Sequence, residues 1–303
     1  MNGSNSEFAR LLNDADFFRT AVSFTAQRTA FPSRLIEKDF FCSMLLEFLA
    51  SASDALVFKG GTCLAKVHAE FYRLSEDLDF VISTPVDAKR AERSKQAVAL
   101  KQAVTEMVRR LPPFRIVRPL TGANNSTQYI AVIGYRSLIS GQENAIKVEV
   151  GLREPLLTAV QVGSARTILL NPVSDQPLMD PVLLPCISKI EAFAEKFRAA
   201  LTRREIAIRD FYDIDYALRR LEVFITDTDL VKLVGQKLAM PGNDPVDVSA
   251  GRLALLRRQL ETQLKFVLRE KDYSDFKLER AVEAVVMMAE KVQASTFKSH
   301  EGA

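Results

Sequence analysis

The sequence predicts an α+β fold, in which a mixed β-sheet lobe with flanking helices is followed by an α-helical C-terminal lobe. Segments with β-branched residues or alternating polarity are confined to about the first 170 residues. Helical periodicity dominates after Pro185, and the segment 171–185 carries four prolines. These observations predict a sheet-containing lobe over residues 1–170, a connection over 171–185 and a helical lobe over 186–303, with a cleft between the lobes.

The sheet-containing lobe should begin with helices up to about residue 52, because apolar residues recur there at helical spacing. Short apolar or alternating runs predict strands at 55–58, 77–83, 115–117, 128–135, 145–151 and 158–170. Two further helices are expected at 62–72 and 85–111, the first following a Gly-Gly turn and the second closed by a Pro-Pro pair. In the second lobe, helices are expected at 187–220, 227–238, 250–270 and 274–293.

Composition limits the chemistry that the chain can perform. With 303 residues and 48% hydrophobic residues, the chain can bury a large core. Its net charge of +3 permits an RNA partner without requiring one. Only His68 and His300 are present, which speaks against histidine-based metal sites and Ser-His-Asp catalysis. Carboxylates, lysines, arginines and backbone groups should therefore carry the chemistry.

The cysteines and the hydropathy pattern indicate a cytoplasmic protein. Cys42, Cys63 and Cys186 show neither close pairing nor metal-ligand spacing, so they are expected to be small core residues in a reducing compartment. The N-terminal residues lack a basic segment followed by an apolar run, and no stretch is long enough to span a bilayer. We therefore expect neither export nor a membrane partner.

A Gly-Gly-Thr turn is the first candidate binding element. Gly60 and Gly61 follow an apolar run and precede a predicted helix, so a triphosphate could approach the backbone and the free N–H groups of the helix start. Lys59 could add positive charge and Thr62 a hydroxyl. The alternative interpretation is an ordinary helix start with Thr62 as its N-cap and a surface lysine beside it.

Two carboxylates follow the turn. On a strand, the segment Asp77-Leu78-Asp79 places both carboxylates on one face, since side chains alternate. Like charges held this close require a cation between them, and Mg²⁺ bound to a nucleoside triphosphate suits such a pair. The alternative interpretation is a polar turn. The two motifs together are more specific than either one.

The order strand, Gly-Gly-Thr, helix and Asp-x-Asp resembles the signature of the nucleotidyltransferase superfamily that includes DNA polymerase beta. This resemblance implies a third carboxylate on a later strand, and Glu149 in Lys147-Val-Glu-Val150 occupies the matching position. Without the resemblance, Glu149 would be an exposed residue of an edge strand. With it, Asp77, Asp79 and Glu149 become the expected ligands of Mg²⁺ or Mn²⁺.

Two motifs look closest to those of the AbiEii/AbiGii (MenT-like) nucleotidyltransferase toxins. They are Phe58-Lys-Gly-Gly-Thr62 and Arg73-Leu-Ser-Glu-Asp-Leu-Asp-Phe80. That family carries a second signature, which Glu195–Arg203 and Arg209–Asp213 resemble. The resemblance covers roughly residues 55–83 and 189–216. It implies the phosphate-binding and catalytic residues Lys59, Gly60, Gly61, Thr62, Ser75, Lys189, Lys196, Arg203 and Asp210, and it leaves open whether Lys189 or Lys196 is the functional lysine.

The second signature also has a periodicity of its own. Lys189, Lys196, Arg203 and Asp210 recur every seven residues and would form one polar stripe on an unbroken helix. Such a stripe is commonly a solvated helix flank. In a cleft, its cations could bind phosphates and neutralise a departing pyrophosphate, while Asp210 or Asp213 could orient the cations or accept a proton. Phe211 and Tyr212 are expected to pack in the core.

The predicted function is that of a toxin-type, Mg²⁺-dependent nucleotidyltransferase that transfers a nucleoside monophosphate from an NTP to an RNA acceptor. The resemblance implies a tRNA 3′ end as the acceptor, a block of translation and growth, and a cognate antitoxin protein as partner. Two alternatives remain open: the same metal site could modify a small molecule or a protein side chain, or the chain could be a non-catalytic RNA- or protein-binding module. Ser75 could carry a regulatory phosphate beside the carboxylates, or be an ordinary turn serine.

Overall fold

The structure is a computed structural model that describes residue 8 and residues 10–301; residues 1–7 and 9 of the predicted N-terminal lobe lie outside the described part. The chain forms two compact units, Met1–Ile187 and Ser188–Ala303. We call them the first and the second unit. Within the described range, no helix has the length and hydropathy required to cross a membrane.

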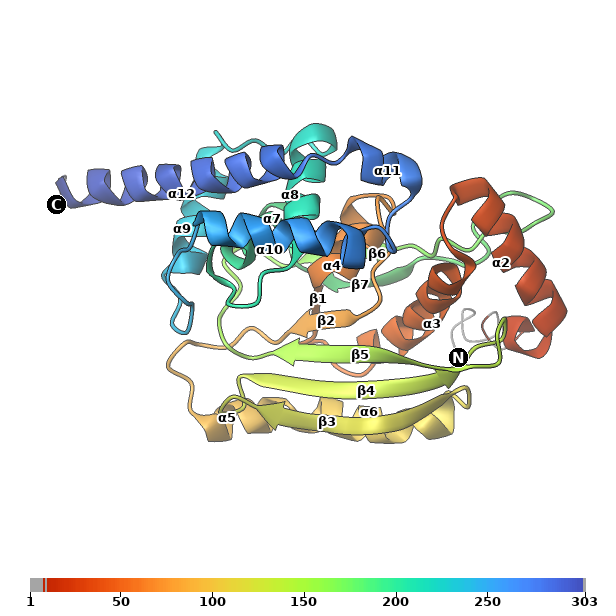
Figure 1. Cartoon of the computed structure of the whole chain (residues 1–303). Coiled ribbons are helices and arrows are strands. Elements are labelled where there is room, and N and C mark those ends of the chain that lie inside the picture. The colour runs from red at the N-terminus through yellow and green to blue at the C-terminus, as the bar shows by residue number, and fades with distance from the viewer. Residues whose placement is uncertain (1–7, 9, 302–303) are drawn as a thin grey trace. The chain divides into compact units, whose positions relative to one another are not determined.

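The first unit is built on a seven-stranded mixed sheet with the order β3-β4-β5-β2-β1-β7-β6 (Figure 1). Its strands are β1 (Val57–Lys59), β2 (Leu78–Val81), β3 (Phe114–Ala123), β4 (Gln128–Arg136), β5 (Glu143–Gly151), β6 (Gln161–Ala165) and β7 (Val182–Cys186). Its helices are α2 (Ala15–Thr29), α3 (Ser33–Ala50), α4 (Gly60–Cys63), the π-helix η1 (Leu64–His68), α5 (Arg90–Gln96) and α6 (Val98–Arg110). This mixed α+β architecture confirms the predicted fold class.

Alternating side chains give the sheet one apolar and one polar face. Along β4, every second residue is buried, and Tyr135 stacks on Phe41 of α3 with ring centroids 4.1 Å apart. Helix α6 packs against β3. On β5, Val148 and Val150 are buried while Glu149 between them is only partly covered. The helices thus cover the apolar face, and polar side chains are left on the other face.

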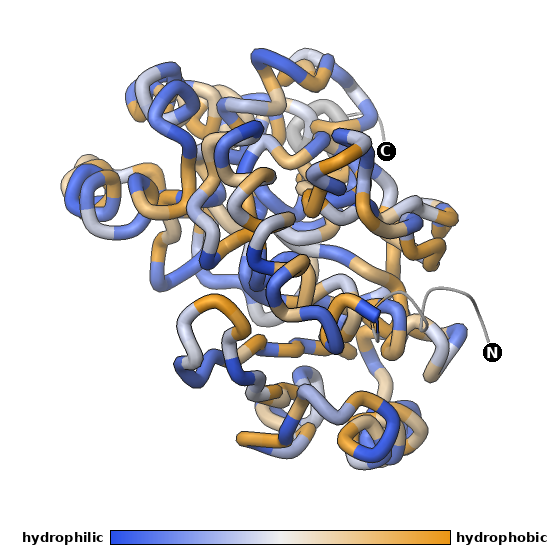
Figure 2. Tube along the Cα trace, turned by 90° about the vertical axis from the view of Figure 1, so that its right-hand side faces the viewer, coloured by the Kyte–Doolittle hydropathy of each residue, from blue (hydrophilic) through white to orange (hydrophobic). Residues whose placement is uncertain are grey.

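The second unit is helical. It contains α7 (Lys189–Thr202), α8 (Ile208–Arg220), α9 (Thr228–Leu238), α10 (Ala250–Gln259), the π-helix η2 (Leu260–Leu264), α11 (Glu270–Asp275) and α12 (Leu278–Glu301). Helix α7 packs against α8 and α9, and α12 packs against all three. Phe211 and Tyr212 are buried, as predicted, and Tyr212 meets Phe276 edge to face. In Figure 2, hydrophobic and hydrophilic residues alternate within the turns of the helices, the pattern expected when one flank is packed.

Several predicted element bounds are wrong. The expected helix 62–72 begins earlier, at Gly60, and ends at His68, where Glu70 and Phe71 adopt positive φ and stop it. The expected helix 85–111 is divided into α5 and α6 at Ala97. Strand β7 lies inside the predicted connection 171–185, because its backbone pairs with β1 and β6. The expected helix 187–220 is interrupted between Thr202 and Ile208.

Candidate active site

Strand pairing brings the predicted carboxylates of the first unit together. Strands β2 and β5 pair in parallel with Asp79 opposite Glu149, and β1 pairs antiparallel to β2 with Lys59 opposite Asp79. Asp77 directly precedes β2. We call Asp77, Asp79 and Glu149 the carboxylate site. Glu149 reaches this site through the register of the sheet, although it is far from Asp79 in the sequence.

The carboxylate site carries more negative than positive charge. Burial, and next the nearby Glu149, raise the pKa of Asp79 to about 6. Each of these effects penalises the charged form of Asp79. An added cation would therefore lower the free energy of this group, which is the electrostatic condition for a metal or substrate site.

Lys147 and Gln128 hold Glu149 in place. The Lys147 Nζ atom lies 3.2 Å from the Glu149 carboxylate, and the Gln128 amide donates to the same group at 2.6 Å. Burial alone would lower the pKa of Lys147, but Glu149 and Asp77 outweigh burial and raise it. The sequence prediction did not include Lys147 or Gln128 in the site. Strand alternation could have found Lys147, which lies two residues before Glu149 on the same face.

The glycine turn touches the carboxylate site directly. Gly60 has φ = +76°, and a Cβ atom built on it would lie 2.3 Å from the Asp79 carboxylate. A Cβ atom on Gly61 would lie 2.6 Å from the Arg73 guanidinium and 3.2 Å from the Ser75 hydroxyl. Gly60 therefore requires glycine for both its backbone conformation and the close approach of Asp79, and a side chain at position 61 would displace Arg73.

Buried polar groups fasten this turn to the rest of the unit. Thr62 is 2% exposed, and its hydroxyl donates to the carbonyl of Asp77. The N-cap position of α4 belongs to Lys59 and not to Thr62. Arg73, which is 2% exposed, fills the space below Gly61. Thr62 thus joins the turn to the carboxylate segment.

A buried ion pair lies near the glycine turn. The Lys66 Nζ atom lies 2.6 Å from the Asp39 carboxylate and 2.8 Å from the Ser43 hydroxyl, and all three residues are buried. The pair ties η1 to α3. Sequence reasoning missed it because a lysine and an aspartate on two separate helices give no local signal of their contact.

In the second unit, the residues of the second signature converge on one ion cluster. The Lys196 Nζ atom lies 2.8 Å from both the Asp210 and the Asp213 carboxylates. The Arg203 guanidinium lies 2.9 Å from the other oxygen of Asp210. We call Lys196, Arg203, Asp210 and Asp213 the ion cluster. Both aspartates are buried, whereas half of the Arg203 side chain is exposed.

The predicted single polar stripe is wrong, because α7 ends at Thr202 and α8 begins at Ile208. The ion cluster forms where the two helices pack against each other. Lys189 lies outside the cluster, and its Nζ atom donates to the carbonyl of Leu221 at 2.5 Å. Between the two candidate lysines, Lys196 is the one that contacts the signature aspartates.

The donor set of the carboxylate site fits a hard divalent cation. Carboxylate oxygens are the ligands that Mg²⁺ prefers, and the close approach of Gly60 leaves the Asp79 oxygens reachable from the turn. The raised pKa of Asp79 shows that the site gains from an added positive charge. Lys147 currently supplies part of that charge.

Comparison with known proteins identifies a family for the chain. A sequence model of the family described as "Nucleotidyl transferase AbiEii toxin, Type IV TA system" matches residues 45–292. No curated protein matches the chain by sequence.

Among solved structures, the chain is similar to two proteins with low sequence identity. JHP933 from Helicobacter pylori is 15% identical with a TM-score of 0.49, covering 89% of this chain and 97% of that one. MenT4, a nucleotidyltransferase toxin from Mycobacterium tuberculosis, is 16% identical with a TM-score of 0.47, covering 88% and 98%. The family match spans most of both units. The chain therefore belongs to the AbiEii nucleotidyltransferase toxin family, and it is a nucleotidyltransferase of a toxin–antitoxin system.

Proposed function

We propose that this nucleotidyltransferase is Mg²⁺-dependent and transfers a nucleoside monophosphate from an NTP to the 3′ end of a tRNA, releasing pyrophosphate and blocking translation and growth. The observation that carries the proposal is the register of the sheet. It sets Asp79 opposite Glu149 and places Gly60 against Asp79. A triphosphate at the turn would thus lie next to the carboxylates.

In this proposal, the residues of the first unit have separate roles in phosphate binding and in support of the glycine turn. The first helical turn, from Gly60 to Thr62, offers backbone N–H groups to the phosphates, and Lys59 adds positive charge. Arg73 and Ser75 support the turn from the side of Gly61. Catalysis then depends mainly on positioning and on charge neutralisation, as in other in-line phosphoryl transfers.

Asp77, Asp79 and Glu149 would hold the divalent cation, whose chemistry is to acidify the acceptor hydroxyl and to offset the charge on the phosphates. Asp79 must be ionised to act as a ligand. Glu149 must give up its contact with Lys147, whose ammonium is then available to an anionic group. Lys147 is thus a further candidate for phosphate binding.

The ion cluster of the second unit supports a role in anion binding for Arg203. One NH group of Arg203 contacts Asp210, and the remaining donors of this half-exposed side chain suit a phosphate. Lys196 and Asp210 hold Arg203 in position, which makes them positioning residues in this proposal. We expect Arg203→Gln to weaken NTP or RNA binding several-fold, measured by calorimetry, and the exposed neighbour variant Arg204→Gln to leave it unchanged.

The family match supports an antitoxin partner, and the tRNA acceptor is part of our proposal. A type IV toxin–antitoxin system implies a cognate antitoxin, and arrest through a blocked tRNA end would place the reaction in the cytoplasm. The structure of the carboxylate site would equally accept a hydroxyl from another substrate, so the experiment must compare acceptor classes directly.

The test is incubation of the purified chain with each labelled NTP and Mg²⁺, separately with total tRNA, with cell-extract protein and with small hydroxyl compounds. We expect label on tRNA, and its loss when the tRNA 3′ end is first oxidised with periodate. Label on protein or small molecules alone would contradict the tRNA proposal. Label on tRNA with Mn²⁺ but not with Mg²⁺ would contradict the choice of metal.

A further inference from the structure

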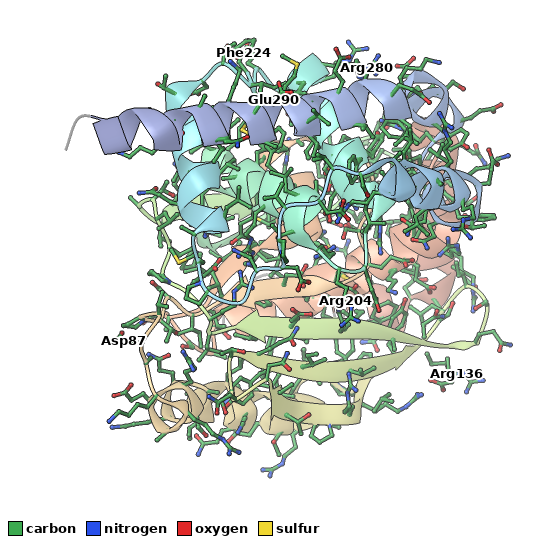
Figure 3. All side chains as sticks on the ribbon, turned by 60° about the vertical axis from the view of Figure 1, so that its left-hand side comes forward. Asp87, Arg136, Arg204, Phe224, Arg280 and Glu290 are labelled. Carbon is green, nitrogen blue, oxygen red and sulfur yellow. The ribbon has the colours of Figure 1, made fainter. Side chains whose placement is uncertain are left out.

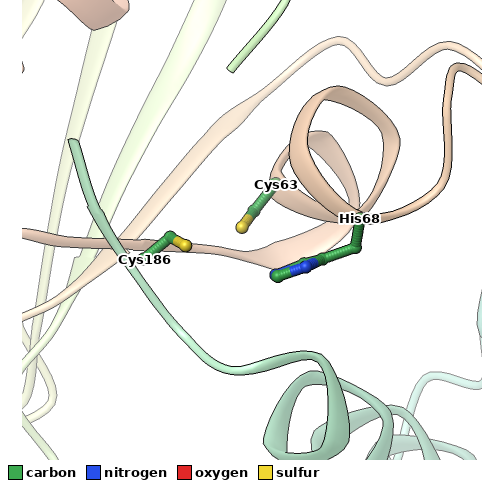
Figure 4. A group of neighbouring side chains, drawn as sticks. All are labelled: Cys63, His68 and Cys186. Atoms are coloured by element: carbon green, nitrogen blue, oxygen red, sulfur yellow. The ribbon is translucent and has the colours of Figure 1, made fainter. Parts of the chain in front are cut away.

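A cluster of two thiols and one imidazole lies in the first unit, next to the glycine turn. One ligand atom each from Cys63, His68 and Cys186 lies within 4.8 Å of the others. Figure 4 shows the two sulfur atoms and the imidazole ring pointing toward one another from α4, from the end of η1 and from β7. We call these residues the thiol–imidazole cluster. None of them belongs to the carboxylate site.

The π-helix η1 explains why Cys63 and His68 meet. In an α-helix, residues five positions apart lie about 140° apart around the axis, at about 100° per residue. The π-helix has hydrogen bonds between residues i and i+5, so it places such residues roughly one above the other. Segment Leu64–His68 is a π-helix, and Cys63 directly precedes it. This rare local geometry therefore aligns a thiol and an imidazole on one face.

The sheet supplies the second thiol. Strand β7 pairs in parallel with β1 so that Cys186 lies opposite Phe58, close to where β1 enters the turn. A Cβ atom on Gly163 of the neighbouring strand would lie 2.5 Å from the Cys186 sulfur. Gly163 thus provides the room in which this sulfur lies.

The hydrogen bond of His68 to a backbone carbonyl leaves its other ring nitrogen able to bind a metal. The Nε2 atom of His68 lies 3.0 Å from the carbonyl oxygen of Ile187. A carbonyl only accepts, so Nε2 carries the hydrogen and Nδ1 is the nitrogen that can offer a lone pair. Ligating histidines typically donate their other N–H to such a carbonyl.

The two kinds of cysteine environment differ sharply. The Cys186 sulfur lies within 4.8 Å of a second thiol and of an imidazole nitrogen. For Cys42, burial dominates and raises the thiol pKa to about 12. Cys42 is therefore an ordinary core thiol and a natural control for the cluster.

We propose that Cys63, His68 and Cys186 form a binding site for a thiophilic divalent cation of the Zn²⁺ class, with a water molecule in the fourth tetrahedral position. Two sulfurs and one imidazole are ligands of Zn²⁺ and not of Mg²⁺, which requires oxygen. Binding replaces the thiol protons, which are released to solvent, so affinity increases with pH. His68 is half-buried and gives the otherwise buried cluster its access to the surface.

Occupancy of this site would fix the glycine turn. Cys63 is the last residue of α4, and its neighbour Thr62 donates to the carbonyl of Asp77. A bound cation would thus hold the turn against β7 and, through Thr62, steady the segment that leads into the carboxylate site. The site differs from the Mg²⁺ site of the proposed function in its residues and in its metal.

The test is titration of the reduced, chelator-treated full chain with Co²⁺, followed by absorption spectroscopy. We expect equimolar binding with a thiolate-to-cobalt charge-transfer band and intense visible bands typical of tetrahedral coordination. Zn²⁺ should abolish the bands and excess Mg²⁺ should not. Asp79→Asn should keep them, so failure of the carboxylate site and failure of this site are distinguishable.

Variants identify the ligands. Cys63→Ser and Cys186→Ser should remove the charge-transfer band or reduce it by half, and His68→Gln should weaken Co²⁺ binding at least tenfold, whereas Cys42→Ser should leave the titration unchanged. Circular dichroism of each variant confirms folding, and His68→Gln, at a half-buried position, tests the site if a cysteine variant fails to fold. Absence of the band in the wild-type chain would overturn the proposal. A Cys63–Cys186 disulfide in mass spectra of the chain purified without reductant would overturn it in favour of a redox pair.

Discussion

The carboxylate site and the ion cluster both concentrate acidic side chains, but they balance the charge differently. In the ion cluster, Asp210 and Asp213 are matched by Lys196 and Arg203 at 2.8–2.9 Å. In the carboxylate site, Lys147 pairs with Glu149, and the charges of Asp77 and Asp79 also act on it, while Lys59 lies opposite Asp79 across the strands.

The pKa of Asp79 reports the resulting imbalance, since burial and Glu149 raise it to about 6. In a balanced cluster, loss of one partner leaves a buried charge uncompensated, whereas an unbalanced cluster is a candidate site for a charged ligand. The carboxylate site, whose negative charge exceeds its positive charge, is therefore the stronger candidate for chemistry.

The largest expected effect is loss of nucleotide transfer in Asp79→Asn. The amide keeps the shape of the side chain but removes the charge that would hold a cation, so we expect transfer to fall by more than about a hundredfold. Single-turnover incorporation of labelled nucleotide measures the loss. The control is Asp87→Asn at an exposed loop position, labelled in Figure 3. Full activity of Asp79→Asn would remove the carboxylate site from the mechanism.

The next effect concerns the ion cluster. Lys196→Met leaves the buried Asp210 and Asp213 without their shared cation, which should lower the free energy of unfolding by about 3–5 kcal/mol. Chemical denaturation measures the loss. The exposed variant Lys232→Met on α9 should change stability little. An unfolding curve of Lys196→Met that coincides with wild type would show that the cluster is not a structural ion network.

A smaller effect separates backbone strain from steric contact at the glycine turn. Gly60→Ala and Gly141→Ala both put alanine at positive φ, +76° and +72°, at a cost of about 1–2 kcal/mol. Only the Gly60 variant also meets the Asp79 carboxylate, because nothing lies within 4 Å of the built Cβ atom at Gly141. We therefore expect a larger loss of stability in Gly60→Ala than in Gly141→Ala, because steric contact adds to the strain, and a roughly tenfold or larger loss of transfer in Gly60→Ala alone. Equal transfer rates for both variants would contradict the close approach.

The smallest effect is a pH dependence of the chain without divalent cation. The pKa of Asp79 is about 6 in the folded chain against 3.8 for an ordinary aspartate. Its ionisation therefore costs stability: the cost is absent below about pH 3.8, grows up to about pH 6 and is complete above that. We expect the stability of wild type relative to Asp79→Asn to fall between pH 5 and pH 7, lowering the relative unfolding midpoint by about 2–4 °C.

Thermal scans in chelator at both pH values measure this difference. Added Mg²⁺ should remove it, because the cation stabilises the ionised carboxylate. A relative midpoint that rises with pH would contradict the raised pKa.

Much of the carboxylate site could be predicted from sequence. The alternation around Asp79 and Glu149 agrees with the structure, in which both are partly covered between buried neighbours, since a strand has a period of two. The glycine pair was expected to admit a triphosphate, which stays a prediction, and in the structure its close neighbours are the Asp79 and Arg73 side chains. Lys147 was missed, although the same alternation places it beside Glu149.

For the ion cluster, the sequence predicts which residues belong together but not how they come into contact. The second signature names Lys196, Arg203 and Asp210, but periodicity placed them on one unbroken helix, and the interruption between Thr202 and Ile208 was missed. The residues meet because two helices pack side by side, and the sequence does not encode that contact locally. Conversely, Lys189 has the right period but contacts Leu221 instead.

The sequence by itself determined the fold class, the two halves of the chain, the family and the residue types at the site, because these depend on short-range periodicity and on motifs. Tertiary structure alone decided that Asp79 lies opposite Glu149, and that Lys196 bridges two aspartates. It also decided that Cys63 and His68 lie close to the distant Cys186. From the spacing of the cysteines, Cys186 was expected only to be a small core residue. The physical reason is that strand register and helix packing are set by contacts between segments far apart in the chain, and these contacts leave no period in the sequence.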